Sequence, residues 1–375
     1  MSIVRRSPPA WFGLMFLPLA AMAQAQSPVP PASTPAPIKR SIEKITDNVY
    51  RATNNNHSTV FLVTDAGIAL ADPINREFAE WFKAEAARQF KVPVKYVFYS
   101  HHHWDHASGG AVFADTAQFV GQASMLKYLA MPPADTRMAA IVGEFAGTAA
   151  LDTNHDGFVD KAEAKGHVTD YEFSGYDADR DGRLSGPEVA RGPVSDVQPP
   201  NITYGDELDV RFGGHRVHLT AMGPMTHGSD VSLITFPDDS VLFAVDYIDV
   251  ARLPYKEIDY TNGLYSEWMA AVKRTERIAG DYKYVMTGHA RRLGTAADLT
   301  AYREYVEALR AEVAAGIARG ESVEQLQSTI KMDKYSTWVG FGWVRENVVG
   351  MYHFVTDAVP VTRGPVTRLP PSGAK

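Results

Sequence analysis

Four histidines and one aspartate, all able to bind a metal, occur within six residues of this sequence. The segment SHHHWDH follows the apolar run 94–99 and contains His101, His103, Asp105 and His106. Alternation in an extended or tightly turned segment places the first two histidines on one side, while the last two ligands can reach a second nearby point. The segment can therefore serve two adjacent metals. It cannot complete either site, because a catalytic zinc takes about three protein ligands.

Three further candidate ligands lie far away in the chain, each after a predicted strand. They are His227 in GPMTHGSD, Asp246 in LFAVDYI and His289 in VMTGHA. An acid directly after an apolar strand is informative, because a buried carboxylate is costly unless it is paired or bound to a metal. The chain has no cysteine, so histidine and carboxylate side chains must hold any transition metal. Either histidine alone would be interpreted as an ordinary polar loop residue, and only the whole series indicates a metal centre.

The complete series resembles the metallo-β-lactamase superfamily, whose binuclear hydrolases carry these ligands in this order. The resemblance covers residues 45–128 and 197–300 and implies a four-layer αββα sandwich. It also implies a role for each ligand: His101, His103 and His227 at one metal, Asp105, His106 and His289 at the other, and Asp246 between them. Asp72, in ALADP, matches the family aspartate that supports a ligand from behind, although a strand-end turn acid is an equal alternative.

Hydrolysis is the chemistry that this resemblance implies. Two divalent cations roughly 3.5–4 Å apart lower the pKa of a shared water towards about 7, so a metal-bridging hydroxide is the expected nucleophile. Asp105 is the predicted catalytic residue, which orients the hydroxide and moves its proton. The bond that is hydrolysed would be that of an ester, lactone, thioester or amide. A β-lactam is disfavoured, since true β-lactamases place Cys or Ser at the position of Asp246. Two zinc ions are expected, with iron or manganese as alternatives.

Two further metal motifs lie in the interior of the chain. Residues 152–163 and 177–188 both fit D-x-[DN]-x-[DN]-G-x₅-E and resemble the calcium loops of a paired EF-hand. The predicted ligands of the first loop are Asp152, Asn154, Asp156, the Phe158 carbonyl, Asp160 and Glu163. Those of the second loop are Asp177, Asp179, Asp181, the Arg183 carbonyl, Ser185 and Glu188. A single match also fits a solvated acidic turn, but two in tandem favour calcium, up to two ions.

The segment that contains these loops is expected to be compact. Only residues 164–176 separate the two loops, so the helices between them must be short. A structural role, in which calcium holds the segment rigid, is therefore favoured over that of a calcium sensor whose helices open to expose a groove. Because the segment lies between the first ligand motif and His227, we expect it to cap the cleft and shape substrate access.

The elements that must position these side chains are read from hydrophobic periodicity. Helices are predicted over residues 77–90 and 299–317, and a capping box at Ser322 begins another. Strands are predicted over 60–63, 68–71, 94–99, 217–221, 231–236, 241–245 and 284–286. The composition of 45% hydrophobic and 22% charged residues excludes disorder as the main state, and the net charge of −7 argues against nucleic acid as a partner.

The chain begins with the pattern of an export signal. Arg5 and Arg6 precede the apolar run 11–23, which is shorter than the ~20 residues of a membrane-spanning helix. A lipid-embedded anchor is the weaker alternative. The predicted organisation is a signal peptide (1–25), a Pro-rich linker (26–40), the metallo-β-lactamase-like domain (41–128 and 197–300), the EF-hand-like insertion (129–196), a C-terminal helical segment (301–361) and a flexible tail (362–375). The mature protein is expected to be periplasmic or secreted and without a transmembrane segment.

Two other functions remain open on sequence grounds. One is an oxidoreductase on the same fold that uses a single iron. The other is a calcium-dependent binding protein without catalysis. The expected partner is a small-molecule substrate, and the sequence does not determine the oligomeric state.

Overall fold

The computed structural model describes residues 38–258 and 263–356. The predicted signal peptide and the predicted tail lie outside the described residues. So does the predicted linker, except for residues 38–40, and Arg40 already begins the first strand.

One sheet has seven strands in the order β1-β2-β3-β4-β5-β6-β9. Its first four strands are antiparallel, and β4, β5, β6 and β9 are parallel. The bounds are β1 (Arg40–Lys44), β2 (Val49–Asn54), β3 (His57–Thr64), β4 (Gly67–Ala71), β5 (Val94–Phe98), β6 (Gln118–Gln122) and β9 (Ile202–Tyr204). The predicted hairpin around residue 66 is confirmed by the pairing of β3 with β4.

The second sheet has five strands in the order β10-β11-β12-β13-β14. Its neighbours are antiparallel except for β13 and β14, which are parallel. The bounds are β10 (Glu207–Phe212), β11 (His215–Ala221), β12 (Ser232–Phe236), β13 (Val241–Ala244) and β14 (Tyr284–Thr287). Every strand predicted from the sequence is present in one of the two sheets.

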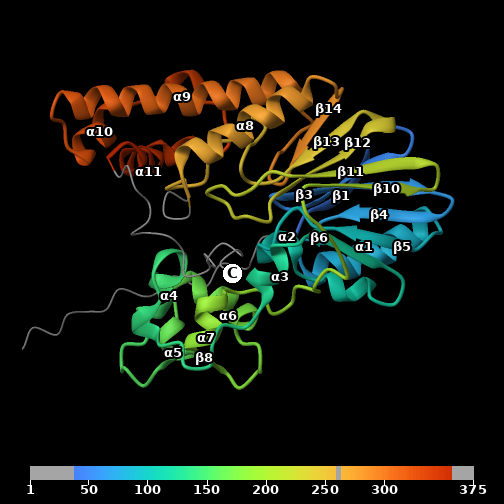
Figure 1. Ribbon diagram of the computed structural model, residues 1–375, viewed down its shortest axis with the longest axis horizontal. Helices are drawn as coiled ribbons and strands as arrows, with labels where there is room; N and C mark the ends of the chain where they lie inside the picture. Colours follow the sequence, from blue (N-terminus) through green and yellow to red (C-terminus); the bar gives the residue numbers. More distant parts are fainter. Residues whose placement is uncertain (1–37, 259–262, 357–375) are drawn as a thin grey trace, which may run out of the picture. The chain divides into compact units, whose positions relative to one another are not determined.

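Helices lie on the outer side of each sheet, with α1 against the first and α8 and α9 against the second (Figure 1). The longer helices are α1 (Arg76–Gln89), α8 (Tyr265–Ala279), α9 (Ala296–Ala318), α10 (Val323–Thr329) and α11 (Val344–Thr356). The helix predicted over 299–317 and the capping box at Ser322 are both confirmed. Helix α9 crosses the boundary predicted between residues 300 and 301. None of the helices in the described part of the chain is long and apolar enough to span a bilayer.

Alternation along β3 shows why the chain forms layers. Phe61 packs into the core beneath α1 with Phe78 and Phe82, while Leu62 belongs to the core shared with the second sheet, which includes Leu219. Successive strand residues point to opposite faces, so one apolar strand serves two cores. The predicted αββα sandwich is confirmed.

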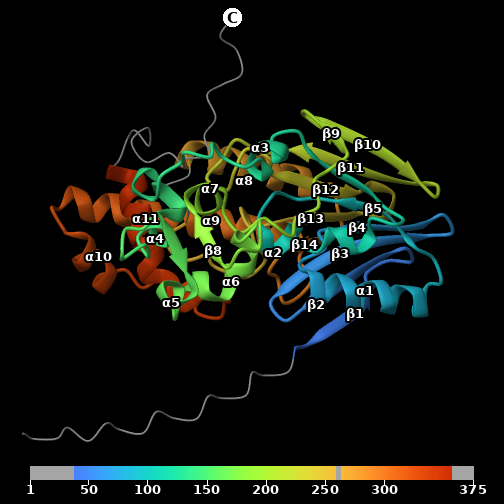
Figure 2. The same ribbon diagram turned by 90° about the horizontal axis from the view of Figure 1, so that it is seen from below.

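The segment between β6 and β9 forms a smaller unit with its own core (Figure 2). A two-stranded ladder joins β7 (Phe158–Asp160) to β8 (Arg183–Ser185). Its helices are α4 (Ala146–Ala149), α5 (Lys161–Ala164), α6 (Val168–Tyr176) and α7 (Gly186–Arg191). The preceding helix α3 (Met125–Leu129) packs through Met125 on the core beneath α1. Val159 and Leu184 are fully buried opposite each other in the ladder. We call residues 129–196 the insertion.

Short 3₁₀ turns complete the described chain. They are η1 (Gly110–Phe113), η2 (Met138–Ala140), η3 (Gly143–Phe145), η4 (Pro237–Asp239), η5 (Asp333–Tyr335) and η6 (Phe341–Trp343). Of these, η3 carries a residue that faces the candidate site.

Candidate metal centre

The loops that follow several strands converge and bring all seven predicted ligands together. The loop after β5 carries His101 and His103 and leads into α2 (Trp104–Ala107), which holds Asp105 and His106. The other three residues follow β11, β13 and β14: His227, Asp246 and His289. Loops at the ends of packed strands thus place these side chains at one edge of the sandwich.

Four of these side chains form a first group whose ligand atoms all lie within 4.8 Å of one another: His101, His103, His227 and Asp246. The Nε2 atoms of His101 and His227 are 3.2 Å apart. Asp246 Oδ2 lies 3.5 Å from the first of these nitrogens and 3.3 Å from the second. The group matches the set predicted for one metal.

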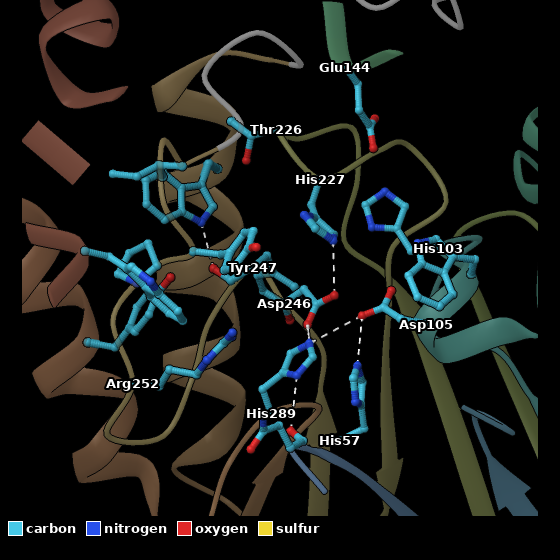
Figure 3. A pocket seen from close by; sticks show the side chains of 18 of the residues that line it. His57, His103, Asp105, Glu144, Thr226, His227, Asp246, Tyr247, Arg252 and His289 are labelled. Carbon is cyan, nitrogen blue, oxygen red and sulfur yellow. Dashed lines mark hydrogen bonds and ion pairs between the residues drawn. The ribbon is translucent and has the colours of Figure 1, made fainter. Parts of the chain in front are cut away.

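A second group at the same spacing contains His57, Asp105, His106 and His289. The Nε2 atoms of His106 and His289 are 3.2 Å apart, and Asp105 Oδ2 is 3.5 Å from the former. Asp246 reaches this group too, with Oδ2 at 3.1 Å from His106 and Oδ1 at 3.0 Å from His289 (Figure 3). Its position between the two groups is the one expected of a bridging carboxylate.

The donor atoms fit divalent metals. Around a tetrahedral metal with bonds of about 2.0–2.1 Å, neighbouring ligand atoms lie about 3.3 Å apart, close to the spacings in both groups. Two imidazole nitrogens that face each other at 3.2 Å need a proton or a cation between their lone pairs. Asp246 Oδ1 is buried, and the polar group of the described chain that approaches it is the His289 ring nitrogen, 3.0 Å away. Because that nitrogen would be a metal ligand and not a hydrogen-bond donor, a cation at this point would satisfy the oxygen.

The charges of the centre also favour a cation. Burial would lower the pKa of His106, but the carboxylates of Asp246 and Asp105 together outweigh it and raise this pKa to about 9. Burial would raise the pKa of Asp246, but His106 and His289 together hold it well below the usual range. Burial and neighbouring histidines lower the pKa of His101 and His103 well below the usual value. The ionised carboxylates and the neutral imidazoles of His101 and His103 are the donors that a metal requires, and a bound cation would replace the proton that the carboxylates favour on His106.

Asp72 lies behind the first ligand motif, as predicted. Its Oδ1 accepts a hydrogen bond from the backbone N–H of Ser100 at 2.8 Å, and the Ser100 hydroxyl is 2.9 Å from His101 Nδ1. Burial raises the pKa of Asp72 to about 7, and interaction with His106 opposes that rise. Asp72 has φ of 39° and Asp246 has φ of 68°, a region that non-glycine residues rarely adopt. Backbone strain of this kind often accompanies functional sites.

Sequence reasoning missed His57, which lies at the first position of β3. Its Nε2 is 3.1 Å from Asp105 Oδ2. The hairpin turn that precedes it, Asn55-Asn56, is a recognisable turn signal. Nothing local to that turn indicates that it meets a ligand loop from another part of the chain.

A cavity of about 450 Å³ opens over the two groups. Glu144 and Glu172 from the insertion line it together with metal-group residues, and Glu144 points towards the histidines (Figure 3). This supports the expectation that the insertion caps the cleft. The opposite wall is largely aromatic, because Tyr247, Tyr255 and Trp343 line the cavity there. Trp338 is not among the lining residues and is partly buried against the core. Arg252, also in the wall, is held by Asp249 at 3.0 Å.

Comparison with known proteins gives the family. Residues 53–289 match the family model of the metallo-beta-lactamase superfamily. This chain belongs to that superfamily. The match begins within β2 and ends at His289, so it includes every residue of both metal groups.

Solved structures resemble the chain at low sequence identity. A metallo-beta-lactamase from Pontibacter korlensis aligns with TM-score 0.45 and 16% identity, covering 70% of this chain and 96% of that one. The stereoselective inverting sec-alkylsulfatase Pisa1 from Pseudomonas sp. aligns with TM-score 0.54 and 11% identity, covering 86% of this chain. The alignment covers 51% of the alkylsulfatase, so this chain spans about half of its length. Among curated proteins, none matches the sequence.

The two acidic loops of the insertion adopt similar turns. At loop position 6, Gly157 and Gly182 both have positive φ and donate their N–H groups to the first aspartate of their own loop at 3.1 Å. In the second loop, ligand oxygens of Asp177, Asp179 and Glu188 lie within 4.8 Å of one another. Both loops therefore turn in the same way at position 6, and the second brings three of its predicted ligands together.

Proposed function

We propose that this chain is an exported, dinuclear metal-dependent hydrolase that cleaves an ester, lactone, thioester or amide of a small molecule. The observation that carries the proposal is the convergence of two ligand groups on one shared carboxylate, Asp246, beneath a cavity. His101, His103 and His227 would hold one metal, and Asp105, His106 and His289 the other. Metals bound there would supply a water of lowered pKa and a Lewis acid for the scissile group.

The side chains of the centre have separate tasks in this proposal. Burial would raise the pKa of Asp105, but interactions with His106 and His57 together hold the pKa of this carboxyl well below its usual range, and a bound metal would act in the same direction. An ionised carboxylate that faces the cavity can orient a water and accept its proton. The hydroxyl of Ser100, next to His101 Nδ1, fixes the ring orientation of that ligand.

The insertion has two proposed roles. Its loops would bind up to two calcium ions and so rigidify the short helices around them. Its glutamates would shape entry to the cavity, since Glu144 and Glu172 stand across from the aromatic wall. Export is proposed from the leader sequence alone.

The decisive experiment combines metal analysis with a substrate panel. The mature protein is assayed with aryl esters, acyl-homoserine lactones, thioesters, nitrocefin and, because of the alkylsulfatase neighbour, secondary alkyl sulfates. We expect two transition metals per chain and one substrate class that is clearly preferred. Asp105→Ala should abolish turnover, whereas Asp209→Ala, on the exposed strand β10, should not. One iron with oxygen consumption would identify the oxidoreductase alternative, and turnover unchanged in Asp105→Ala would reject the proposal.

A further inference from the structure

We infer that His57 is an additional ligand of the second metal, so that the two metal positions differ in how many protein donors they have. This inference rests on the proposed function, because it requires a metal between Asp105, His106 and His289. It adds a residue to the seven that the sequence motifs supply.

The first argument is the geometry of the imidazole. His57 Nε2 lies 3.1 Å from Asp105 Oδ2, which is the oxygen that also approaches His106 Nε2 at 3.5 Å and His289 Nε2 at 3.7 Å. All four side chains offer ligand atoms within 4.8 Å of one another. The His57 nitrogen therefore points at the same place as the ligands and not away from them (Figure 3).

The second argument is that the backbone holds His57 in place. His57 pairs with Asn54 across the two-residue turn of the β2–β3 hairpin. The next residue, Ser58, donates its N–H to the Gly288 carbonyl at 2.7 Å, and Arg51 donates to the Ala290 carbonyl at 2.8 Å. The hairpin is thus hydrogen-bonded to the residue before His289 and to the residue after it. A side chain fixed in this way is preorganised as a ligand, because little conformational freedom is lost when a metal binds.

The consequence concerns the open coordination position. With His57, the second metal would have three imidazoles, Asp105 and a share of Asp246, which nearly completes its coordination. The first metal would have three imidazoles and a share of Asp246. A catalytic metal needs a position for water or substrate, so we assign the more open position to the first metal.

The alternative role for His57 is that of a positioning residue, which only hydrogen-bonds Asp105. Two substitutions distinguish the roles. His57→Ala removes both ligand and hydrogen bond. His57→Gln keeps an N–H donor for Asp105 but removes the imidazole. His218→Gln is the matched control, because His218 pairs with Asp209 on the second sheet, away from both metal groups.

The test is metal content after dialysis, together with metal affinity measured by competition with a chelating dye, on the full mature chain. We expect two metals in the unsubstituted protein and in His218→Gln, but one tightly held metal in both His57 variants, with the second dissociation constant raised about 100-fold or more. X-ray absorption of His57→Gln reloaded with both metals at excess should show one imidazole fewer per metal pair than the unsubstituted protein. Two metals held with unchanged affinity in either His57 variant would overturn the inference alone. No metal in the unsubstituted protein would overturn the proposed function as well.

Discussion

The histidine centre and the acidic loops of the insertion are built in opposite ways. The centre collects side chains from residues 57 to 289, and strand ends of both sheets fix each of them. His101 and His106 are buried, at 1% and 0% exposed, and the other residues of the two metal groups are partly buried. Each acidic loop takes all its candidate ligands from twelve consecutive residues, and five of the twelve candidates in the two loops are exposed. A rigid scaffold is therefore needed for the first kind of site, whereas local turns suffice for the second.

The two acidic loops also differ from each other. Glu188 of the second loop is 4% exposed and accepts hydrogen bonds from Ala178 N–H and Ser185 N–H. Glu163 occupies the same position in the first loop. Among the described residues of that loop, no three ligand atoms lie within 4.8 Å of one another, as those of the second loop do. Burial of the last glutamate distinguishes the better-formed loop.

The largest expected effect is a loss of activity that leaves the insertion unchanged. Asp246→Asn removes a shared charge from both metal groups, so kcat/KM should fall about 10³-fold or more, because one preorganised electrostatic group alone is worth about 10²–10³. Metal analysis should show loss of at least one ion, while Asp209→Asn keeps both. Calcium-dependent changes in circular dichroism should persist. Their disappearance would show that the two regions are not independent.

The next effect is a loss of stability in the insertion that leaves the two sheets of the sandwich unchanged. Leu184→Ala leaves a cavity in the core of the insertion and should destabilise it by about 2–5 kcal/mol. Hydrogen exchange should rise in the ladder of β7 and β8 and stay unchanged in β13 and β14. Leu126→Ala, at a side chain that is 44% exposed, should change exchange little. Equal loss of protection in both sheets and the ladder would contradict independent cores.

A third prediction compares the acidic loops. Glu188→Gln should weaken calcium binding about tenfold or more, because it removes a charge from the only loop in the described chain with three converged ligands. Glu163→Gln should have the smaller effect. Calorimetric titration of both variants with calcium measures the difference. A larger effect of Glu163→Gln would reverse the proposed order of the loops.

The smallest effect concerns the glutamate that links the two regions. Burial, and then the charges of Asp105 and Glu144, raise the pKa of Glu172 to about 7. A raised carboxyl pKa favours the folded state below the unfolded value, and this advantage is lost as pH rises through about 7. Glu172→Gln should therefore raise the free energy of unfolding at pH 8 by about 1 kcal/mol, allowing for partial exposure, and have no effect at pH 4.

Thermal unfolding of chelator-treated protein measures this shift, since bound cations would draw the pKa of Glu172 down again. Glu80→Gln, at an exposed position of α1, is the control and should behave alike at both pH values. A stabilisation by Glu172→Gln that is equal at both pH values would contradict the electrostatic cause.

The sequence predicted most of what depends on short-range pattern. Alternation and helical spacing identify the strands and α9, and twelve contiguous residues are enough to indicate each acidic loop. The seven candidate ligands could be selected because they follow predicted strands and, taken together, form the series typical of the superfamily. His57 was not, because its approach to Asp105 depends on contacts between the β2–β3 hairpin and the loop after β14. The position of Glu172 over the cavity likewise depends on how the insertion packs.

One ion pair between the acidic loops has a consequence for the order of their occupation. The Arg183 guanidinium lies 2.9 Å from Asp156 Oδ2 and 4.0 Å from the centre of the Phe158 ring. Asp156 is thus already neutralised by a resident cation of the neighbouring loop. A calcium bound by the first loop, as we propose, would compete with that arginine for Asp156, whereas no ion pair of the described residues engages the three converged ligands of the second loop. The second loop should therefore bind calcium at a lower concentration than the first. Loss of the ion pair between Arg183 and Asp156 would then mark the binding of calcium to the first loop.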